Sequence, residues 1–125
     1  MKIFFSAAAV FGFLGVAFGS FGAHSLKDRL EPYYLDIFKT GVQYQMYHAL
    51  ALLAVALFMK FQPSQANNLL NYAGWAFVIG IVIFSGSLYI LSISGIKIFG
   101  AITPIGGLCF LAGWAMLFLY ALKKV

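Results

Sequence analysis

Residues 3–23 read IFFSAAAVFGFLGVAFGSFGA and contain no aspartate, glutamate, lysine or arginine. A helix rises about 1.5 Å per residue, so a run of this length can cross a hydrocarbon core about 30 Å thick. Three further uncharged runs follow at residues 41–59, 62–96 and 98–122. These four runs leave little of the 125-residue chain for anything else. The sequence therefore predicts an all-α membrane protein, with one domain (residues 1–125) of four transmembrane helices in an up-down bundle.

The expected spans cover about residues 3–23, 41–60, 71–94 and 103–122. Between the first two spans, one helical face is formed by Leu30, Tyr34, Ile37, Phe38 and Gly41. Pro32 suits the first turn of a helix. We therefore expect a short amphipathic segment from Pro32 onward, which lies at the membrane interface or runs into the second span.

The remaining connections carry local signals for turns and helix ends. The polar stretch at residues 60–71 predicts a connection on the side of the chain termini. Thr103 followed by Pro104 is typical of an N-cap with proline at the first helical position. The last helix is therefore expected to begin there.

The composition agrees with a membrane protein. Apolar residues make up 63% of the chain and charged residues 9%, far below the roughly 25% of soluble domains. The eight Lys and Arg residues, which give a net charge of +5, are scattered between the apolar runs. They mark span ends, where cations meet anionic headgroups. Cys109 is the single cysteine, so the chain has no intrachain disulfide and no thiolate metal site. We expect membrane lipids as partners, and no nucleic acid, metal or cofactor.

Lysine and arginine near the span ends usually set the orientation of a membrane protein. Here the count is even, with one side carrying Lys2, Lys60, Lys123 and Lys124 and the other carrying Lys27, Arg29, Lys39 and Lys97. The free α-amino group adds slightly to the first side. We therefore expect both termini to be cytoplasmic.

Glycines recur at steps of three or four residues along the first span, at Gly12, Gly15, Gly19 and Gly22. This spacing places them in one stripe, where a neighbouring backbone can approach closely. The stripe favours a packed span over a cleavable signal peptide, which the N-terminal region also resembles. We assign the same packing role to Gly106 and Gly113. The stripe could serve packing within the bundle or between copies, so a homo-oligomer stays open as an alternative.

Polar residues of the predicted spans share one depth. In the second span, Gln43, Tyr44, Tyr47 and His48 fall on one side of the helix, opposite Met46, with Gln45 between the two sides. Five residues of the other predicted spans and their ends share this depth, within roughly 15 Å of the membrane surface opposite the termini: His24, Ser85, Ser87, Tyr89 and Thr103. We expect either a structural network that sets helix register or a cavity that binds a lipid headgroup, a small solute or a cation. His48 is too deep for bulk water and should have a polar partner from another helix or from His24.

The sequence contains no set of residues that is diagnostic of a particular reaction. Proton-coupled exporters of similar size need a carboxylate in the membrane, and no predicted span contains aspartate or glutamate. Two histidines without a third ligand make a poor metal site, and Ser85 and Ser87 lack the context of an activated nucleophile. We therefore expect no catalytic residue and no enzyme, and we favour a structural or accessory membrane protein. A small oligomeric transporter or channel for a small solute or cation is the alternative.

Five ordered segments carry a family resemblance: GSFGAH at 19–24, GVQYQMYHAL at 41–50, FSGSLY at 84–89, GAITPIGG at 100–107 and GW at 113–114. With these segments the chain resembles the YwdK and YgdD type of small bacterial membrane proteins, a domain-of-unknown-function family related to eukaryotic transmembrane protein 256. Ser20 stands where the family usually has alanine, a small-for-small change. The resemblance implies four spans, a multi-pass location in the bacterial plasma membrane, cytoplasmic termini and a link to membrane integrity, without an established reaction.

Overall fold

The structure, a computed structural model, describes residues 2–62 and 68–124. Every element within them is helical. In chain order these are α1 (Lys2–Phe21), the π-helical turn η1 (Gly22–Leu26), α2 (Pro32–Phe61), α3 (Asn68–Gly80), the π-helical turn η2 (Ile81–Ser85), α4 (Gly86–Ser94) and α5 (Ile98–Lys124). Within the described chain, four helices are long and apolar enough to cross a membrane, because α1 continues through η1 and α3 continues through η2 into α4. The predicted all-α fold with four spans is confirmed.

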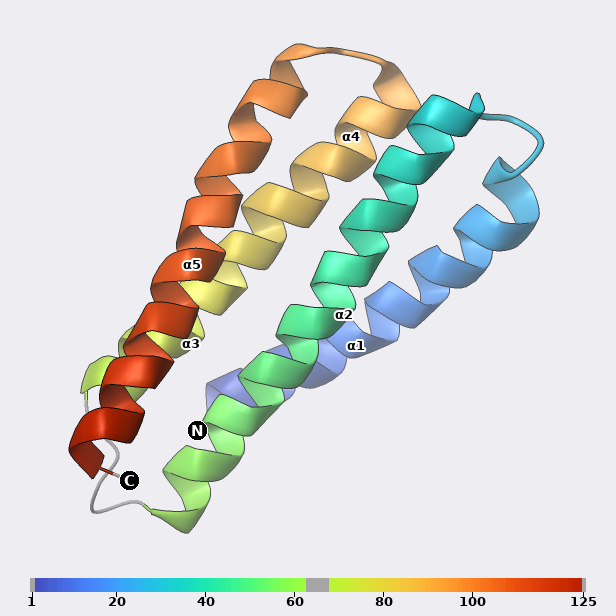
Figure 1. The fold of residues 1–125 in the computed structure, drawn as a ribbon. Coiled ribbons are helices and arrows are strands. Elements are labelled where there is room, and N and C mark those ends of the chain that lie inside the picture. Colours follow the sequence, from blue (N-terminus) through green and yellow to red (C-terminus); the bar gives the residue numbers. More distant parts are fainter. Residues whose placement is uncertain (1, 63–67, 125) are drawn as a thin grey trace.

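Figure 1 shows how the helices lie. The described ends of the chain lie toward the lower end of the picture, and the turns at residues 27–31 and 95–97 lie at its upper end, which we call the turn end. α1 packs mainly against α2, and α5 packs mainly against the continuous α3–η2–α4 helix. The two pairs meet where α2 contacts α3, η2 and α4. α2 therefore lies inside the bundle, whereas α1 and α5 are outer helices.

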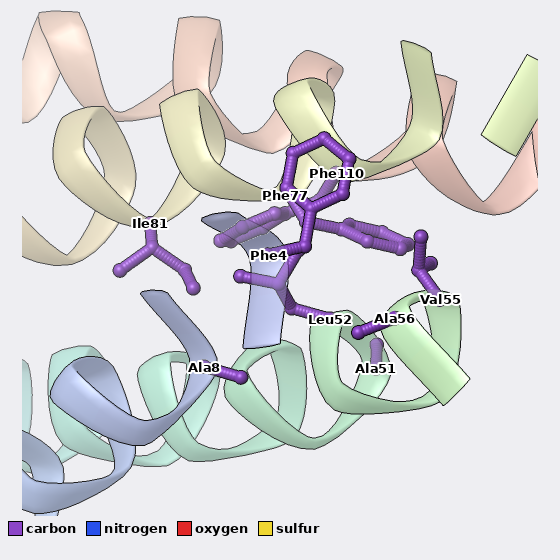
Figure 2. Packing of buried hydrophobic residues seen from close by; sticks show 9 residues of the cluster. All are labelled: Phe4, Ala8, Ala51, Leu52, Val55, Ala56, Phe77, Ile81 and Phe110. Carbon is purple, nitrogen blue, oxygen red and sulfur yellow. The ribbon is translucent and has the colours of Figure 1, made fainter. Parts of the chain in front are cut away.

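An apolar core formed by all four spans lies away from the turn end. Figure 2 shows nine buried side chains, which come from all four spans: Phe4, Ala8, Ala51, Leu52, Val55, Ala56, Phe77, Ile81 and Phe110. Phe4 is 1% exposed, and its ring lies over Gly74, where an added Cβ would come within 2.5 Å of the ring. Small residues on α2 and α3 thus let large rings fill the space between the spans, which gives the close packing of a protein interior.

Two predicted boundaries differ from the structure. The start of the last helix at Thr103 is wrong, because α5 begins at Ile98 and Pro104 lies inside it. The Thr103 hydroxyl donates to the Phe99 carbonyl, 3.0 Å away, so Thr103 is an interior residue and not a cap. The reason lies in the preceding turn. Gly95 ends α4 in the left-handed conformation, with φ of 72°, so the chain reverses at once and re-enters a helix at Ile98.

The amphipathic segment between the first two spans is not a separate element. α2 begins at Pro32 and continues to Phe61 without a break. The segment therefore extends the second span, as one of the two expected arrangements had it. The predicted polar connection at residues 60–71 is shorter than expected, because its first two residues belong to α2 and α3 begins at Asn68. Residues 63–67 of that connection lie outside the described residues.

The glycine stripe of α1 faces α2 over part of its length. An added Cβ would meet Met46 at Gly15, Val42 at Gly19 and Phe38 at Gly22. Gly12 differs, because nothing described lies within 4 Å of its added Cβ. Met46, expected on the side opposite the polar residues, thus lies against Gly15 of α1.

The two glycines singled out in the fourth span both lie against the third span. A Cβ on Gly113 would come within 2.5 Å of the Phe77 ring. At Gly106 the nearest atoms belong to the Phe84 backbone, within η2. α5 therefore approaches the third span backbone to backbone at Gly106, which holds the Phe84 side chain beside α5.

Candidate functional site

The polar residues toward the turn end form several separate hydrogen-bonded groups. The first group joins three helices through Gln45, which is only 3% exposed. Its amide nitrogen donates to the Phe11 carbonyl of α1 at 2.8 Å, and its amide oxygen accepts from the Tyr89 hydroxyl of α4 at 2.6 Å. The residue that sequence reasoning left between the two sides of the second span therefore lies at the centre of an α1–α2–α4 contact.

The second group ties the third span to α2 and α5. The Ser85 hydroxyl donates to the Gly41 carbonyl of α2 at 2.7 Å, and this bond is fully buried. The hydroxyls of Ser87 and Thr103 lie within hydrogen-bond distance, 2.6 Å apart, and bridge α4 and α5. The structure thus brings Ser85, Ser87 and Thr103 into contacts between helices, as their common depth suggested.

The third group contains His48, which is 4% exposed. The Trp114 indole N–H of α5 donates to His48 Nε2 at 3.0 Å. His48 Nδ1 lies 2.8 Å from the Tyr44 carbonyl. An indole nitrogen can only donate and a carbonyl can only accept, so the ring is neutral with its proton on Nδ1. The imidazole also stacks on Phe110, with centroids 3.6 Å apart and ring planes 6° apart.

The expected partner of His48 therefore comes from another helix, but it is Trp114, which sequence reasoning missed. The two residues are 66 positions apart. A signal was present, since a buried indole N–H usually finds an acceptor and Trp114 lies in the middle of an apolar span. Phe110 was also missed, because an aromatic residue within a predicted span is interpreted as part of the apolar core.

The single network predicted around His48 is not formed. The Gln43 amide donates to the Tyr47 hydroxyl at 2.6 Å within α2, and both side chains are exposed on the helix surface. His24, in η1, is exposed and has no hydrogen bond among the described residues. Every buried side-chain nitrogen and oxygen of the described chain has a partner. The embedded polar groups toward the turn end are therefore paired locally, in small clusters that join helices.

A groove of about 750 Å³ lies between α2 and α5, with Phe84 of η2 between them. Its α2 wall consists of Tyr44, Tyr47 and His48, and its α5 wall consists of Pro104, Gly107, Leu108, Phe110, Leu111 and Trp114. The groove opens on the outer face of the bundle, where Leu108 and Leu111 are 65% and 66% exposed. Because the buried polar atoms of its wall are already paired, the groove offers an occupant an apolar and aromatic surface.

The described residues can be compared with what a metal site and an activated serine require. Within the described residues, no three or more His, Cys, Asp or Glu side chains come together to hold a metal ion. Ser85 and Ser87 bond to a carbonyl and a hydroxyl, whereas an activated nucleophile needs an adjacent base. The arrangement can bind an apolar group and hold the helices together.

Comparisons with known proteins agree with the resemblance noted in the sequence. A family model described as "Protein of unknown function (DUF423)" matches residues 18–107. The "UPF0382 membrane protein YwdK" of Bacillus subtilis is 47% identical, over 98% of this chain and 98% of the relative. The "UPF0382 membrane protein SH2409" of Staphylococcus haemolyticus is 43% identical, over 100% of this chain and 99% of the relative. No solved structure shows a significant match.

Proposed function

The chain belongs to the DUF423 family, in which its relatives are named UPF0382 membrane proteins, and from this membership we propose a structural or accessory role in the bacterial plasma membrane. In this role the protein supports membrane integrity without catalysing a reaction. We propose further that it binds a phospholipid, whose acyl chain occupies the α2–α5 groove.

The observation that carries this proposal is the depth of the groove. At about 1.5 Å per residue, Pro104 lies roughly 10 Å along α5 from Lys97 at the turn end, and Trp114 lies roughly 25 Å from it. The groove therefore covers the depth of the acyl chains, in a hydrocarbon core about 30 Å thick. An outward-facing apolar groove at this depth would be filled from the surrounding lipid.

The paired polar clusters support the structural part of the proposal. Contacts of the kind formed by Gln45 and by Ser85 fix how the helices are rotated against one another. A proton-coupled transporter instead needs an ionisable side chain exposed to substrate within the membrane. His48, the buried histidine of the second span, has both ring nitrogens engaged with protein atoms.

Native mass spectrometry of the detergent-purified protein tests the groove, because it counts the phospholipids that the protein retains. The variant is Gly107→Leu, since an added Cβ at Gly107 meets only the Phe84 ring, at 3.9 Å, and a longer side chain enters the groove. The control is Gly12→Leu, which adds the same bulk on α1 in open space.

We expect Gly107→Leu to retain one phospholipid fewer than wild type and Gly12→Leu to retain the same number. Circular dichroism should show equal helix content in all three proteins. Equal lipid retention by the two variants would refute acyl-chain binding in the groove. A dimer that Gly107→Leu dissociates would assign the groove to a second copy and would likewise refute the proposal.

A further inference from the structure

A smaller pocket of about 300 Å³ lies at the turn end, between the start of α2 and the turn before α5. It is lined by Tyr33, Tyr34, Leu91, Lys97 and Gly100. Three of these side chains carry hydrogen-bond donors. Among the described residues, neither tyrosine hydroxyl nor the Lys97 ammonium has a hydrogen bond or ion-pair partner. Two tyrosines and a lysine whose polar ends bond to no other described residue therefore line one pocket.

The local fold brings these donors together. Pro32 starts α2, so Tyr33 and Tyr34 lie in its first turn, with their rings packed edge to face at 5.1 Å. Gly95 turns the chain back with φ of 72°, which places Lys97 directly before α5. The Tyr34 hydroxyl reaches this turn, because it lies 3.9 Å from the position of a Cβ on Gly95. Two segments that are about sixty residues apart thus meet at the membrane surface.

The chemistry of the pocket fits a phosphate group. The Lys97 ammonium can only donate, and both tyrosine hydroxyls can donate as well, so the set favours a ligand that carries acceptor oxygens and negative charge. Charge-assisted hydrogen bonds to such oxygens are the strong ones. The amino end of α5 adds partial positive charge beside Lys97. No carboxylate belongs to the lining in the part of the chain that the structure describes. A choline or ethanolamine ammonium would find no counter-ion there, so the pocket favours a headgroup with net negative charge.

The pocket and the groove lie on the same face of the molecule. At 100° per residue, Tyr33 and Tyr44 fall within about 20° of each other on α2, as do Gly100 of the pocket and Gly107 of the groove on α5. The groove begins at Pro104, about 10 Å deeper than Lys97. A single lipid can therefore place its phosphate in the pocket and an acyl chain in the groove.

We propose that Tyr33, Tyr34 and Lys97 bind the phosphate of an anionic phospholipid whose acyl chain occupies the α2–α5 groove. This inference rests on the proposed function and adds the class of lipid. The opposite ends of one lipid are then recognised separately, the charge by the turn end and the apolar chain by the aromatic groove.

The test is a titration of the full-length protein in detergent, followed by native mass spectrometry, with phosphatidylglycerol and phosphatidylcholine of identical acyl chains. Wild type should prefer phosphatidylglycerol. Lys97→Gln should lower its affinity for phosphatidylglycerol about tenfold, as expected for a lost charge-assisted hydrogen bond. Tyr34→Phe should lower it by a smaller factor. Each variant should lower the affinity for phosphatidylcholine by a smaller factor than that for phosphatidylglycerol, because the choline ammonium offsets the phosphate charge in that headgroup.

Lys27→Gln is the matched control, because it removes the same charge from the exposed turn at residues 27–31, outside the pocket. An equal loss in Lys27→Gln and Lys97→Gln would show general surface attraction and overturn the inference. An unchanged lipid preference in Lys97→Gln, together with loss of both lipids in Gly107→Leu, would overturn the headgroup pocket while the groove stands. Loss of preference in Lys97→Gln, with both lipids still bound by Gly107→Leu, would support the pocket and refute the groove.

Discussion

Gly106→Ala is the change for which the structure predicts the sharpest effect on stability. A Cβ at this position would overlap the backbone nitrogen and Cα of Phe84 in η2. Backbone atoms of a packed helix cannot swing aside as the end of a flexible side chain can, so α5 and the third span must separate. Overpacking of this kind costs about 1–3 kcal/mol, and the cost rises where the neighbour cannot move.

The adjacent glycine provides the matched control for Gly106→Ala. A Cβ on Gly107 has its nearest neighbour at 3.9 Å, which is ordinary van der Waals contact. Gly107→Ala should therefore keep the intrinsic helix preference of alanine over glycine, up to about 1 kcal/mol in its favour. Gly106→Ala gains the same preference, so the two variants should differ in the free energy of unfolding by the overpacking cost alone, about 1–3 kcal/mol.

Equilibrium unfolding in mixed micelles, followed by circular dichroism, measures this difference. Both variants change glycine to alanine in one helix, one residue apart, so effects on membrane insertion and expression should be similar. If the two proteins unfold at the same denaturant mole fraction, the close approach of α5 to η2 is wrong. A destabilised Gly107→Ala with a normal Gly106→Ala would instead mean that α5 is rotated from its described position.

Two further outcomes follow from the polar contacts and the charge pattern. Gln45→Leu removes the bonds that join α1 and α4 through α2 and should lower the free energy of unfolding by about 1–3 kcal/mol. Gln43→Leu loses only an exposed bond within α2 and should lower it by under about 1 kcal/mol. Equal losses for the two variants, measured by unfolding in micelles, would contradict the buried contact. The orientation can be tested in intact cells with a variant that lacks the native cysteine. A cysteine that replaces Lys27 should react with a membrane-impermeant thiol reagent and one that replaces Lys60 should not, because we expect both termini to be cytoplasmic. The reverse labelling pattern would show the opposite orientation.

The number of spans and the helical class could be predicted from the sequence because they depend on a local property. A charged side chain at the centre of a bilayer is costly, so a stretch of about 20 residues without charge marks a span wherever its neighbours lie. Backbone groups in hydrocarbon must bond within their own segment, which makes each span a helix. The packing surface around Gly15, Gly19 and Gly22 follows from the same regular geometry.

The partners of the polar residues could not be predicted, because they depend on how each helix is rotated against its neighbours. A step of one residue turns a side chain by about 100°, so the choice between Tyr44 and Gln45 as the buried residue needs the positions of α1 and α4. The hydrophobic periodicity of α2 does not show which of the two residues is buried, since several sides of this helix are covered by other spans.

Local composition thus determined that this chain crosses the membrane as four helices, because the cost of burying charge is set residue by residue. Only the tertiary structure decided that Trp114 donates to His48 across 66 positions, and that α2 and α5 leave a groove between them. Both depend on the spacing and rotation of whole helices, which many weak contacts fix together. The turn at Gly95 is a local feature by contrast, and it lets α5 begin ahead of the Thr103–Pro104 signal.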